Sequence, residues 1–460
     1  MVLRSLTIAT LLGASSLAAQ APSRAALVQR LDSIAGAPVA AGSVAGMAVA
    51  VVRGRDTLLL KGYGLADLEN QVPATPQSVF RIGSVTKQFT AAAVMQLVEQ
   101  GKVSLDDDMA KFLPRYPTRG KRITVRHLLN HTSGIPSYTD VGATFGAVIR
   151  SDLSHDSLVA LIAPNALMFE PVSHFYYNNT GYYMLGMLIE QVTGKSYSDW
   201  LAAQMFAPLG LPGTTYCDTR KLIPRRAHGH DRGAQGLVNT SFISMDLPYA
   251  AGSLCSTVVD LVRWTDHLAS GRVVSSASYG AMTSPVPLTS GRPMTYGFGL
   301  TVDTLGAHRV VSHGGGINGF ISSLVHLPQD SLIIAVLANT SPAPADQVAM
   351  ALARATLGLP PATPPGPPKD LAIAAADRAK FAGSYDLTRP DGTRNPVRIF
   401  EENGQLMIQS DGERAVRLMS QGGDVFIAPG VGRVAFDVAG ARVTGFVLGG
   451  GARRLEAVRR

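Results

Sequence analysis

The segment RIGSVTKQFT, residues 81–90, places a serine and a lysine at the start of an apolar helix. Beyond it, apolar residues recur at helical spacing until a glycine stop, which predicts a mostly buried helix over residues 85–100. Ser84 and Lys87 stand three residues apart, so a helix brings both side chains onto one face. A lysine in the first turn is disfavoured by the helix dipole and by desolvation, so stability does not explain its position.

The chemistry of serine offers an explanation for the lysine. A serine hydroxyl is a poor nucleophile until a base removes its proton, and a lysine whose charged form is disfavoured can act as that base. The simpler interpretation is that Ser84 caps the helix while Lys87 extends to water. On S-x-x-K alone the simpler interpretation is favoured, because the pattern is short.

Two further motifs change this balance. Tyr177-Asn178-Asn179 and then His313-Gly314-Gly315 follow Ser84-Val85-Thr86-Lys87, in the order in which serine β-lactamases and penicillin-binding proteins carry S-x-x-K, S-D-N and K-T-G. From about residue 25 to about residue 358 the chain resembles the family of class C β-lactamases, D-amino-acid peptidases and related esterases. The blocks that carry the resemblance are FRIGSVTKQFTA, ITVRHLLNHTSGIP, FYYNNTGYYMLG and SHGGGINGF. It implies an α/β (α+β) fold, with a β-lactamase-like antiparallel sheet flanked by helices and a helical subdomain.

The resemblance also implies roles for the first two motifs. Ser84 is the expected nucleophile, and Tyr177 is expected to share general acid and base duty with Lys87. Asn179 is expected to hydrogen-bond the substrate or Lys87. As structural alternatives, Tyr177 is a core aromatic residue and Asn179 the N-cap of the helix that follows, and Asn179 is compatible with both roles.

The third motif ends a predicted strand at a glycine run, whose missing side chains let a substrate backbone approach closely. By resemblance, His313, Gly315 and Gly316 contact the substrate, and the backbone N–H groups of Ser84 and Gly316 hold the oxyanion. His313 departs from the lysine of K-T-G. A histidine of pKa near ~6.5 is mostly neutral at neutral pH and attracts the carboxylate of a β-lactam or a D-Ala-D-Ala peptide poorly. We therefore expect poor β-lactamase activity, with partial recovery as the pH falls toward 6.

Other motifs carry less chemistry. AHGHDR (residues 227–232) holds His228 and His230 but lacks the spacing of a zinc hydrolase, and a surface or core role is favoured. HTSGIP (residues 131–136) matches the family and is expected to shape the loop beside the cleft. No G-x-S-x-G nucleophile elbow is present. No metal or organic cofactor is expected.

The flanking sequence predicts how the chain is organised. A β-hairpin is expected over residues 46–64, helices through about residue 220, strands over 309–339 and a closing helix over 345–358. LPPATPPGPPK then reads as a semi-rigid proline-rich spacer, and the short alternating runs after it predict a small antiparallel barrel or sandwich, similar to the lipocalin-like appendage of some family peptidases. The predicted units are a signal peptide (1–21), a β-lactamase-like hydrolase domain (22–358), a linker (359–369) and an antiparallel β domain (370–460).

The N-terminus has the features of a secretory signal: a positive start, an apolar stretch and an A-x-A cleavage site at residues 19–21. The apolar stretch falls short of the ~20 residues that cross a bilayer, so stable membrane insertion is not expected. The mature protein is expected in the periplasm or outside the cell. Export permits Cys217 and Cys255 to pair, and two isolated buried thiols are an equally good interpretation.

Composition excludes other classes. Apolar residues make up 46% of the 460 residues and charged residues 16%, as in an ordinary globular protein. The net charge is +8, yet the basic residues are scattered, so no nucleic-acid partner is expected. We therefore expect an exported serine hydrolase that forms an acyl-enzyme on Ser84 and acts on small esters, D-amino-acid amides or short peptides. The alternatives are a β-lactamase or DD-peptidase of the same fold and a non-catalytic binder of cell-wall peptides. The sequence leaves the oligomeric state open.

Overall fold

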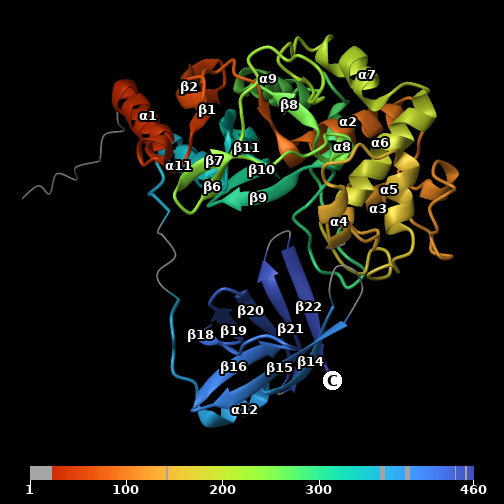
Figure 1. Cartoon of the computed structure of the whole chain (residues 1–460), viewed down its shortest axis with the longest axis vertical. Coiled ribbons are helices and arrows are strands. Elements are labelled where there is room, and N and C mark those ends of the chain that lie inside the picture. Colours follow the sequence, from red (N-terminus) through yellow and green to blue (C-terminus); the bar gives the residue numbers. More distant parts are fainter. Residues whose placement is uncertain (1–22, 141–142, 363–367, 389–393, 441, 451–452) are drawn as a thin grey trace, which may run out of the picture.

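The computed structural model describes residues 23–140, 143–362, 368–388, 394–440, 442–450 and 453–460 (Figure 1). The expected signal peptide lies outside the described residues, as do residues 363–367 of the proline-rich segment. Among the described residues, no helix combines the length and the apolar character needed to cross a membrane.

A seven-stranded antiparallel sheet organises the larger, N-terminal part of the chain, in the order β3-β2-β1-β12-β11-β10-β9. The predicted hairpin is confirmed as β1 and β2, and the three later strands as β10, β11 and β12. β1 pairs with β12, so the two ends of this region meet at the centre of the sheet. The strands are β1 (Gly46–Arg53), β2 (Asp56–Asp67), β3 (Val72–Pro73), β9 (Thr301–Leu305), β10 (His308–Ile317), β11 (Phe320–Leu327) and β12 (Leu332–Ala338).

Each face of this sheet packs against its own hydrophobic core, because successive side chains of a strand point to opposite faces. In β1, Met47, Val49 and Val51 join the core under α1 (Arg24–Ala40) and α11 (Ala345–Thr356). Ala48 and Ala50 belong to the core on the other face, where the remaining helices lie. The predicted closing helix is thus confirmed as α11, and the mixed fold with a helix-flanked antiparallel sheet is confirmed.

The helical region is the part of the chain between β3 and β9. Its leading helix, α2 (Thr86–Glu99), agrees with the predicted helix to within one residue at each end. Helices were expected through about residue 220, but three more follow before the sheet resumes. The others are α3 (Val125–Leu129), α4 (Ala143–Val148), α5 (His155–Ile162), α6 (Asn179–Thr193), α7 (Tyr197–Leu201), α8 (Tyr249–Gly252), α9 (Val258–Ala269) and α10 (Ser276–Met282). Short 3-10 or π turns occupy Gly83–Val85, Met109–Lys111, Tyr138–Asp140, Ala202–Phe206 and Pro328–Asp330.

Two small sheets brace the helical region. β13 (Thr340–Ser341), β6 (His230–Gly233) and β7 (Gly236–Asn239) form one, and β4 (Phe80–Arg81), β8 (Leu254–Ser256) and β5 (Thr215–Tyr216) form the other.

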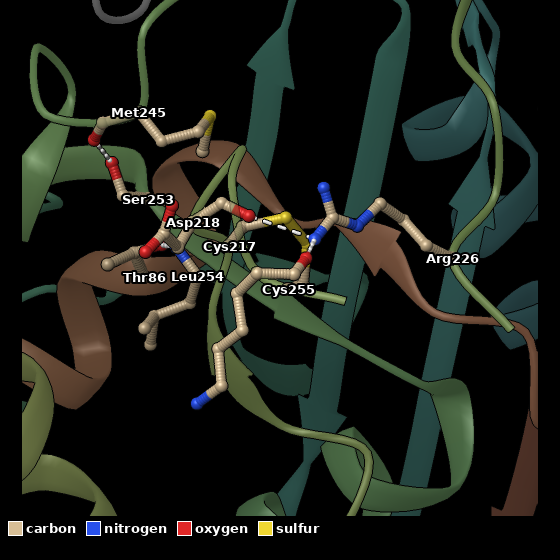
Figure 2. The surroundings of a disulfide bond; sticks show 9 residues. Thr86, Cys217, Asp218, Arg226, Met245, Ser253, Leu254 and Cys255 are labelled. Atoms are coloured by element: carbon tan, nitrogen blue, oxygen red, sulfur yellow. Dashed lines mark hydrogen bonds between the residues drawn. A yellow bond between two sulfur atoms is a disulfide. The ribbon is translucent and has the colours of Figure 1, made fainter. Parts of the chain in front are cut away.

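A disulfide strengthens the second small sheet. Cys217, directly after β5, is bonded to Cys255 in β8, with Cα atoms 5.1 Å apart (Figure 2). Of the two interpretations of the cysteines, pairing is therefore the one observed. The neighbouring Leu254 donates its backbone N–H to the Thr86 hydroxyl at 3.1 Å, so the bridged strand is tied to the first residue of α2.

The C-terminal part folds into one nine-stranded antiparallel sheet that curls into a nearly closed barrel. Its edge strands, β17 and β18, are consecutive in the chain, so the two edges come together. The helix α12 (Ala375–Phe381) sends Phe381 into the barrel core. The strands are β14 (Gly383–Thr388), β15 (Arg394–Glu402), β16 (Gln405–Ser410), β17 (Val416–Arg417), β18 (Met419–Gly422), β19 (Val425–Ala428), β20 (Gly432–Ala439), β21 (Arg442–Gly450) and β22 (Arg453–Arg459).

The barrel lies beside the helical region (Figure 1) and meets it through an ionic contact. The Glu456 carboxylate on β22 lies 2.9 Å from the His174 ring and 4.0 Å from the Arg292 guanidinium. Residues of the barrel strands β20, β21 and β22 line one cavity together with the glycine run of β10, so the barrel lies beside that strand.

Candidate active site

Ser84 lies in the tight turn Gly83–Val85 that joins β4 to α2. Gly83 adopts a positive φ of 48°, and a Cβ on it would come within 2.9 Å of the Gly316 backbone nitrogen. The turn therefore requires glycine, and the chain beside the serine packs directly against β10. This packing brings the first and third sequence motifs together.

Lys87 is buried in the first turn of α2 with 0% of its surface exposed. Its ammonium nitrogen lies 3.1 Å from the Ser84 Oγ, 2.8 Å from the Asn179 Oδ1 and 2.9 Å from the Ala251 carbonyl oxygen. The lysine does not extend to water, so the simpler interpretation of the S-x-x-K pattern is wrong for this side chain. The predicted proximity of Ser84, Lys87 and Asn179 is observed.

The surroundings of Lys87 disfavour its charged form. All three hydrogen-bond partners are neutral oxygen atoms, and burial lowers the pKa of Lys87 well below its ordinary value. The rings of Tyr177 and Tyr182 lie 4.7 and 5.5 Å from its nitrogen and compensate little of that cost. A neutral amine has two N–H groups and one lone pair. In that neutral form, which burial favours, the two amide oxygens can take the N–H groups because they are the shorter contacts, and the lone pair can then face the Ser84 hydroxyl.

Tyr177 lies just before α6, and it lines the same cavity as Ser84. Burial raises the pKa of the Tyr177 phenol above its ordinary value, and the neighbouring Ser84 hydroxyl offsets part of that rise. The phenol oxygen has no partner of full hydrogen-bond geometry among the described residues. Tyr177 is therefore a neutral phenol held beside the nucleophile.

The assignment of Asn179 as an N-cap is wrong. Asn178 is the N-cap of α6, because its side chain accepts from the Gly181 N–H at 2.8 Å. Asn179 is the first residue of the helix, and its side chain is free to point to Lys87. The Ser137 hydroxyl accepts its backbone N–H at 3.1 Å. The two adjacent asparagines thus divide the structural and the site role between them.

The third motif lies on β10, where the glycines permit a close approach of backbone to backbone. A Cβ on Gly315 would lie 2.1 Å from the Ile82 carbonyl oxygen and 3.0 Å from the Ser84 nitrogen. The backbones of Ser84 and Gly316 consequently lie side by side. Gly315 and Gly316 both line the cavity that contains Ser84.

His313 lies on the same strand and is buried, with 6% of its surface exposed. The Tyr296 hydroxyl lies 2.8 Å from its Nε2, and the Gly314 carbonyl oxygen lies 2.6 Å from its Nδ1. Burial first, and then the charge of Lys87, lowers the pKa of His313 to about 3. The expected partial recovery of carboxylate binding toward pH 6 assumed an ordinary histidine pKa; with the lowered pKa we expect no recovery, because the ring stays neutral at that pH.

Ser84 lies where two cavities meet. The larger, about 900 Å³, extends along β10 to the barrel, and the smaller, about 370 Å³, lies on the helical side. The barrel's share of the larger cavity consists of residues on β20, β21 and β22, namely Arg433, Ala435, Asp437, Val447, Gly449 and Glu456. The smaller cavity has an apolar wall that includes Phe145 and Leu247, and Asp140 and Asn179 also line it.

Some of these residues carry no sequence signal. Ala251 contributes only its carbonyl oxygen, which no residue type encodes. Tyr296 lies in a segment without periodicity.

His228 lies outside both cavities, in a largely exposed group with Asp67 and Glu69 whose possible ligand atoms are within 4.8 Å of one another. Such groups are common without an ion and assign no metal site.

Comparison with known proteins identifies relatives over most of the chain. The family model described as Beta-lactamase matches residues 31–359. Penicillin-binding protein 4* of Bacillus subtilis (strain 168) is 29% identical over 391 residues, which cover 80% of this chain and 85% of that protein.

Two further relatives are named for D-amino-acid chemistry. The D-aminopeptidase of Brucella canis (strain ATCC 23365 / NCTC 10854 / RM-666) is 30% identical over 324 residues, covering 69% of this chain and 61% of that protein. The chain thus spans less than two thirds of that relative's length. The solved D-amino acid amidase from Ochrobactrum anthropi SV3, in complex with L-phenylalanine, has a TM-score of 0.61 and 28% identity, covering 68% of this chain and 91% of that one.

Proposed function

The chain belongs to the beta-lactamase family of serine hydrolases, and we propose that it hydrolyses small D-aminoacyl amides and short esters through an acyl-enzyme on Ser84. The observation that carries this proposal is the set of contacts around Lys87. A buried amine whose two N–H groups are taken by Asn179 and Ala251 presents its lone pair to the Ser84 hydroxyl. This arrangement activates a serine at neutral pH.

In the first half of the proposed reaction, Lys87 removes the Ser84 proton as the oxygen attacks the substrate carbonyl. The backbone N–H groups of Ser84 and Gly316 stabilise the oxyanion, which is worth several kcal/mol when donors are fixed in advance. As the intermediate collapses, the carbon–nitrogen or carbon–oxygen bond breaks. The proton taken from Ser84 passes through Lys87 and Tyr177 to the leaving amine or alcohol.

In the second half, water attacks the ester carbonyl of the acyl-enzyme. The same two residues take its proton and return it to the Ser84 oxygen, which releases the substrate as a carboxylic acid. The high pKa of Tyr177 suits this role, because a phenol that stays neutral can donate a hydrogen bond to the leaving group.

The proposed substrate class rests on the cavities and on the relatives. The D-aminopeptidase and the D-amino acid amidase are named for D-amino-acid substrates, and the two cavities accept groups on both sides of the scissile bond. In the smaller cavity, Asp140 supplies a carboxylate for a substrate ammonium, beside an apolar wall for its side chain. The barrel residues line part of the larger cavity, which favours small molecules over polymers.

Position 313 disfavours β-lactams and D-Ala-D-Ala peptides, because a neutral ring at this position adds no attraction to the substrate carboxylate. His313 is neutral at neutral pH, since burial lowers its pKa to about 3. We therefore place this chain with the amidases and esterases of the family rather than with its β-lactamases or DD-peptidases. A non-catalytic binder is disfavoured by Lys87, whose burial costs stability and serves no purpose in binding alone.

Side-by-side kinetics test the proposal. D-Aminoacyl p-nitroanilides, p-nitrophenyl esters and a chromogenic cephalosporin are compared at pH 7.5, and we expect the first two to be hydrolysed at least about tenfold more efficiently. Ser84→Ala should abolish turnover and fluorophosphonate labelling while the Tm is unchanged or higher. An alanine variant that retains more than about 5% of turnover would contradict the nucleophile, and a preference for the cephalosporin would contradict the substrate class.

Export belongs to the same proposal. The signal-like sequence at residues 1–21 and the Cys217–Cys255 bond both suit an oxidising compartment. Fractionation of cells that express the full chain, followed by N-terminal sequencing, tests it. A cytoplasmic protein that retains Met1 would contradict it.

A further inference from the structure

His131, the first residue of the HTSGIP segment, lies against the catalytic cluster rather than at the edge of the cleft. It is buried, with 1% of its surface exposed, and adopts a left-handed backbone conformation with φ of 62°. A positive φ is uncommon for a residue other than glycine, and it persists where the surrounding structure determines it. The contacts of His131 indicate what that conformation serves.

Two hydrogen bonds from His131 bracket Tyr177. The Tyr176 N–H donates to the His131 carbonyl oxygen at 3.0 Å, and the Asn178 N–H donates to the His131 Nδ1 at 3.1 Å. The imidazole also packs on the Tyr177 ring, with centroids 4.4 Å apart. One residue thus fixes the backbone on both sides of Tyr177 and one face of its ring. Because the phenol oxygen has no partner of full geometry, these contacts decide where it points.

The bonding also fixes the protonation of His131. A ring nitrogen that accepts a hydrogen bond carries no proton, so Nδ1 is bare and Nε2 carries the hydrogen. Burial above all lowers the pKa of His131 well below its ordinary value. The ring is therefore neutral, and Nδ1 is the ring atom that accepts the hydrogen bond from Asn178.

We infer that His131 is a positioning residue for the reaction: its carbonyl oxygen and its neutral Nδ1 hold the Tyr177 phenol at Ser84. The inference rests on the acid and base role proposed for Tyr177. His131 lines neither cavity, so it acts through its neighbours, and Tyr177 is the neighbour that it holds through both the backbone and the ring.

Two near-isosteric substitutions test the role of the ring nitrogen. His131→Asn keeps an acceptor close to the Nδ1 position and tolerates a positive φ, whereas His131→Leu removes the acceptor. Rates are expressed per active site titrated with a fluorophosphonate, so unfolded molecules do not count. We expect His131→Leu to lower kcat by about 10- to 100-fold, with KM changed less than about threefold, because a misplaced group of this kind slows the chemical step. His131→Asn should retain kcat within about fivefold.

His131→Gln extends the test should the leucine variant not fold. Its amide reaches toward the Nε2 position and leaves the Asn178 N–H without an acceptor, so it should lose kcat as the leucine variant does. Equal kcat per titrated site in wild type and in either acceptor-free variant would overturn the inference. Equal losses in the asparagine and the acceptor-free variants would overturn it as well, because the loss would then be structural.

A double-mutant cycle separates this inference from the proposed function. In a Tyr177→Phe background, His131→Leu should lower kcat by less than about twofold further, because both changes remove the same contribution. A Tyr177→Phe variant with wild-type kcat would overturn the proposed role of Tyr177 and the inference with it. An impaired Tyr177→Phe variant beside a fully active His131→Leu variant would overturn the inference alone.

Discussion

The aromatic cluster behind Ser84 and the aromatic cluster inside the C-terminal barrel surround different chemical groups. The barrel cluster contains Phe381, Tyr385, Phe426, Phe436 and Phe446, whose ring centroids lie 4.6–6.2 Å apart. Its one phenol, Tyr385, donates to the Phe381 carbonyl oxygen at 2.7 Å. The cluster is apolar and its hydroxyl is paired, as expected where side chains serve only to stabilise the fold.

The cluster behind Ser84 has similar ring packing and the opposite polarity. His131 lies 4.4–6.0 Å from the rings of four aromatic neighbours, and Lys87 lies among the same groups. The His131 Nε2 and the Tyr177 hydroxyl have no hydrogen-bond partner of full geometry within the described ranges. Each of these features lowers stability.

The two clusters therefore predict opposite effects of mutation on stability and on activity. Changes in the barrel cluster should lower stability and leave the chemistry per folded molecule largely intact. Changes in the cluster behind Ser84 should alter the chemistry more than the stability, and removing its buried amine should raise stability.

Replacing Lys87 should separate activity from stability most clearly. Lys87→Met should lower kcat/KM by about 10³-fold or more and raise the Tm. The folded pKa of Lys87 lies below its unfolded value, so below ~10.4 the unfolded chain binds the extra proton and unfolding is favoured. Methionine removes this penalty, and the gain in Tm should therefore shrink toward pH 10. The exposed Lys102→Met is the control, and a lower Tm in Lys87→Met would contradict this prediction.

A substitution in the barrel cluster should have the opposite effect, namely lower stability with little change in activity. Phe426 is fully buried, and Phe426→Ala should cost about 3–5 kcal/mol of barrel stability because it leaves a cavity among the rings. The rate of fluorophosphonate-titrated enzyme on a small ester should fall less than about threefold, because the change is remote from Ser84. Calorimetry and single-turnover kinetics measure the two quantities, with Val431→Ala on the barrel surface as the control. A large loss of single-turnover rate at full titration would show that the barrel core serves the chemistry.

The sequence predicted the parts of both regions that local patterns encode. Ser84 and Lys87 were identified because one helical turn holds them together, and Tyr177 and Asn179 because their motif keeps its spacing. The hairpin, the closing helix and the barrel strands followed from periodicity and turn residues. The boundaries of the units at residues 358 and 370 stay predictions.

What the sequence could not predict depends on tertiary packing. The Ala251 carbonyl oxygen binds Lys87, yet any residue type provides a carbonyl. The barrel's share of the cavity depends on how two units dock, which no periodicity encodes. A histidine in water has a pKa near ~6.5. Burial lowers the pKa of His313 to about 3, and no sequence pattern indicates that burial. The burial of polar side chains was the feature that the sequence predicted least well.

A substitution at His313 tests whether a positive charge beside the cluster behind Ser84 improves activity on substrates that carry a carboxylate. His313→Lys should raise the cephalosporin kcat/KM relative to that of a neutral ester by about tenfold or more, since attraction to the substrate carboxylate is worth about 1–4 kcal/mol. His313→Gln, which adds no charge, should not raise this ratio. In the wild type the ratio should be the same at pH 6 and pH 7.5, because the pKa of His313 is about 3. A ratio that rises between pH 7.5 and pH 6 would mean that the ring is charged in that range.

The smallest expected effect is at the contact between the two regions. The Glu456 carboxylate, with 38% of its side chain exposed, raises the pKa of His174 and is itself stabilised in its charged form by that ring. Glu456→Gln should therefore cost at most about 1 kcal/mol, as exposed ion pairs do, and should change the KM of a long substrate more than that of a short one.

The sign of the pH dependence makes this last prediction specific. A histidine whose pKa is raised by its partner contributes stability below its unfolded pKa of ~6.5 and loses it as the pH rises through the folded value. Wild type should consequently approach Glu456→Gln at pH 8.5 and differ from it most at pH 6, measured as the radius of gyration in solution scattering and as KM for the long substrate. Arg292 also contacts the Glu456 carboxylate, so part of the contact should persist in wild type at high pH. Glu413→Gln, an exposed change elsewhere on the barrel, is the matched control. A difference between wild type and Glu456→Gln that is the same at pH 6 and at pH 8.5 would mean that Arg292, not His174, holds the barrel at the cavity.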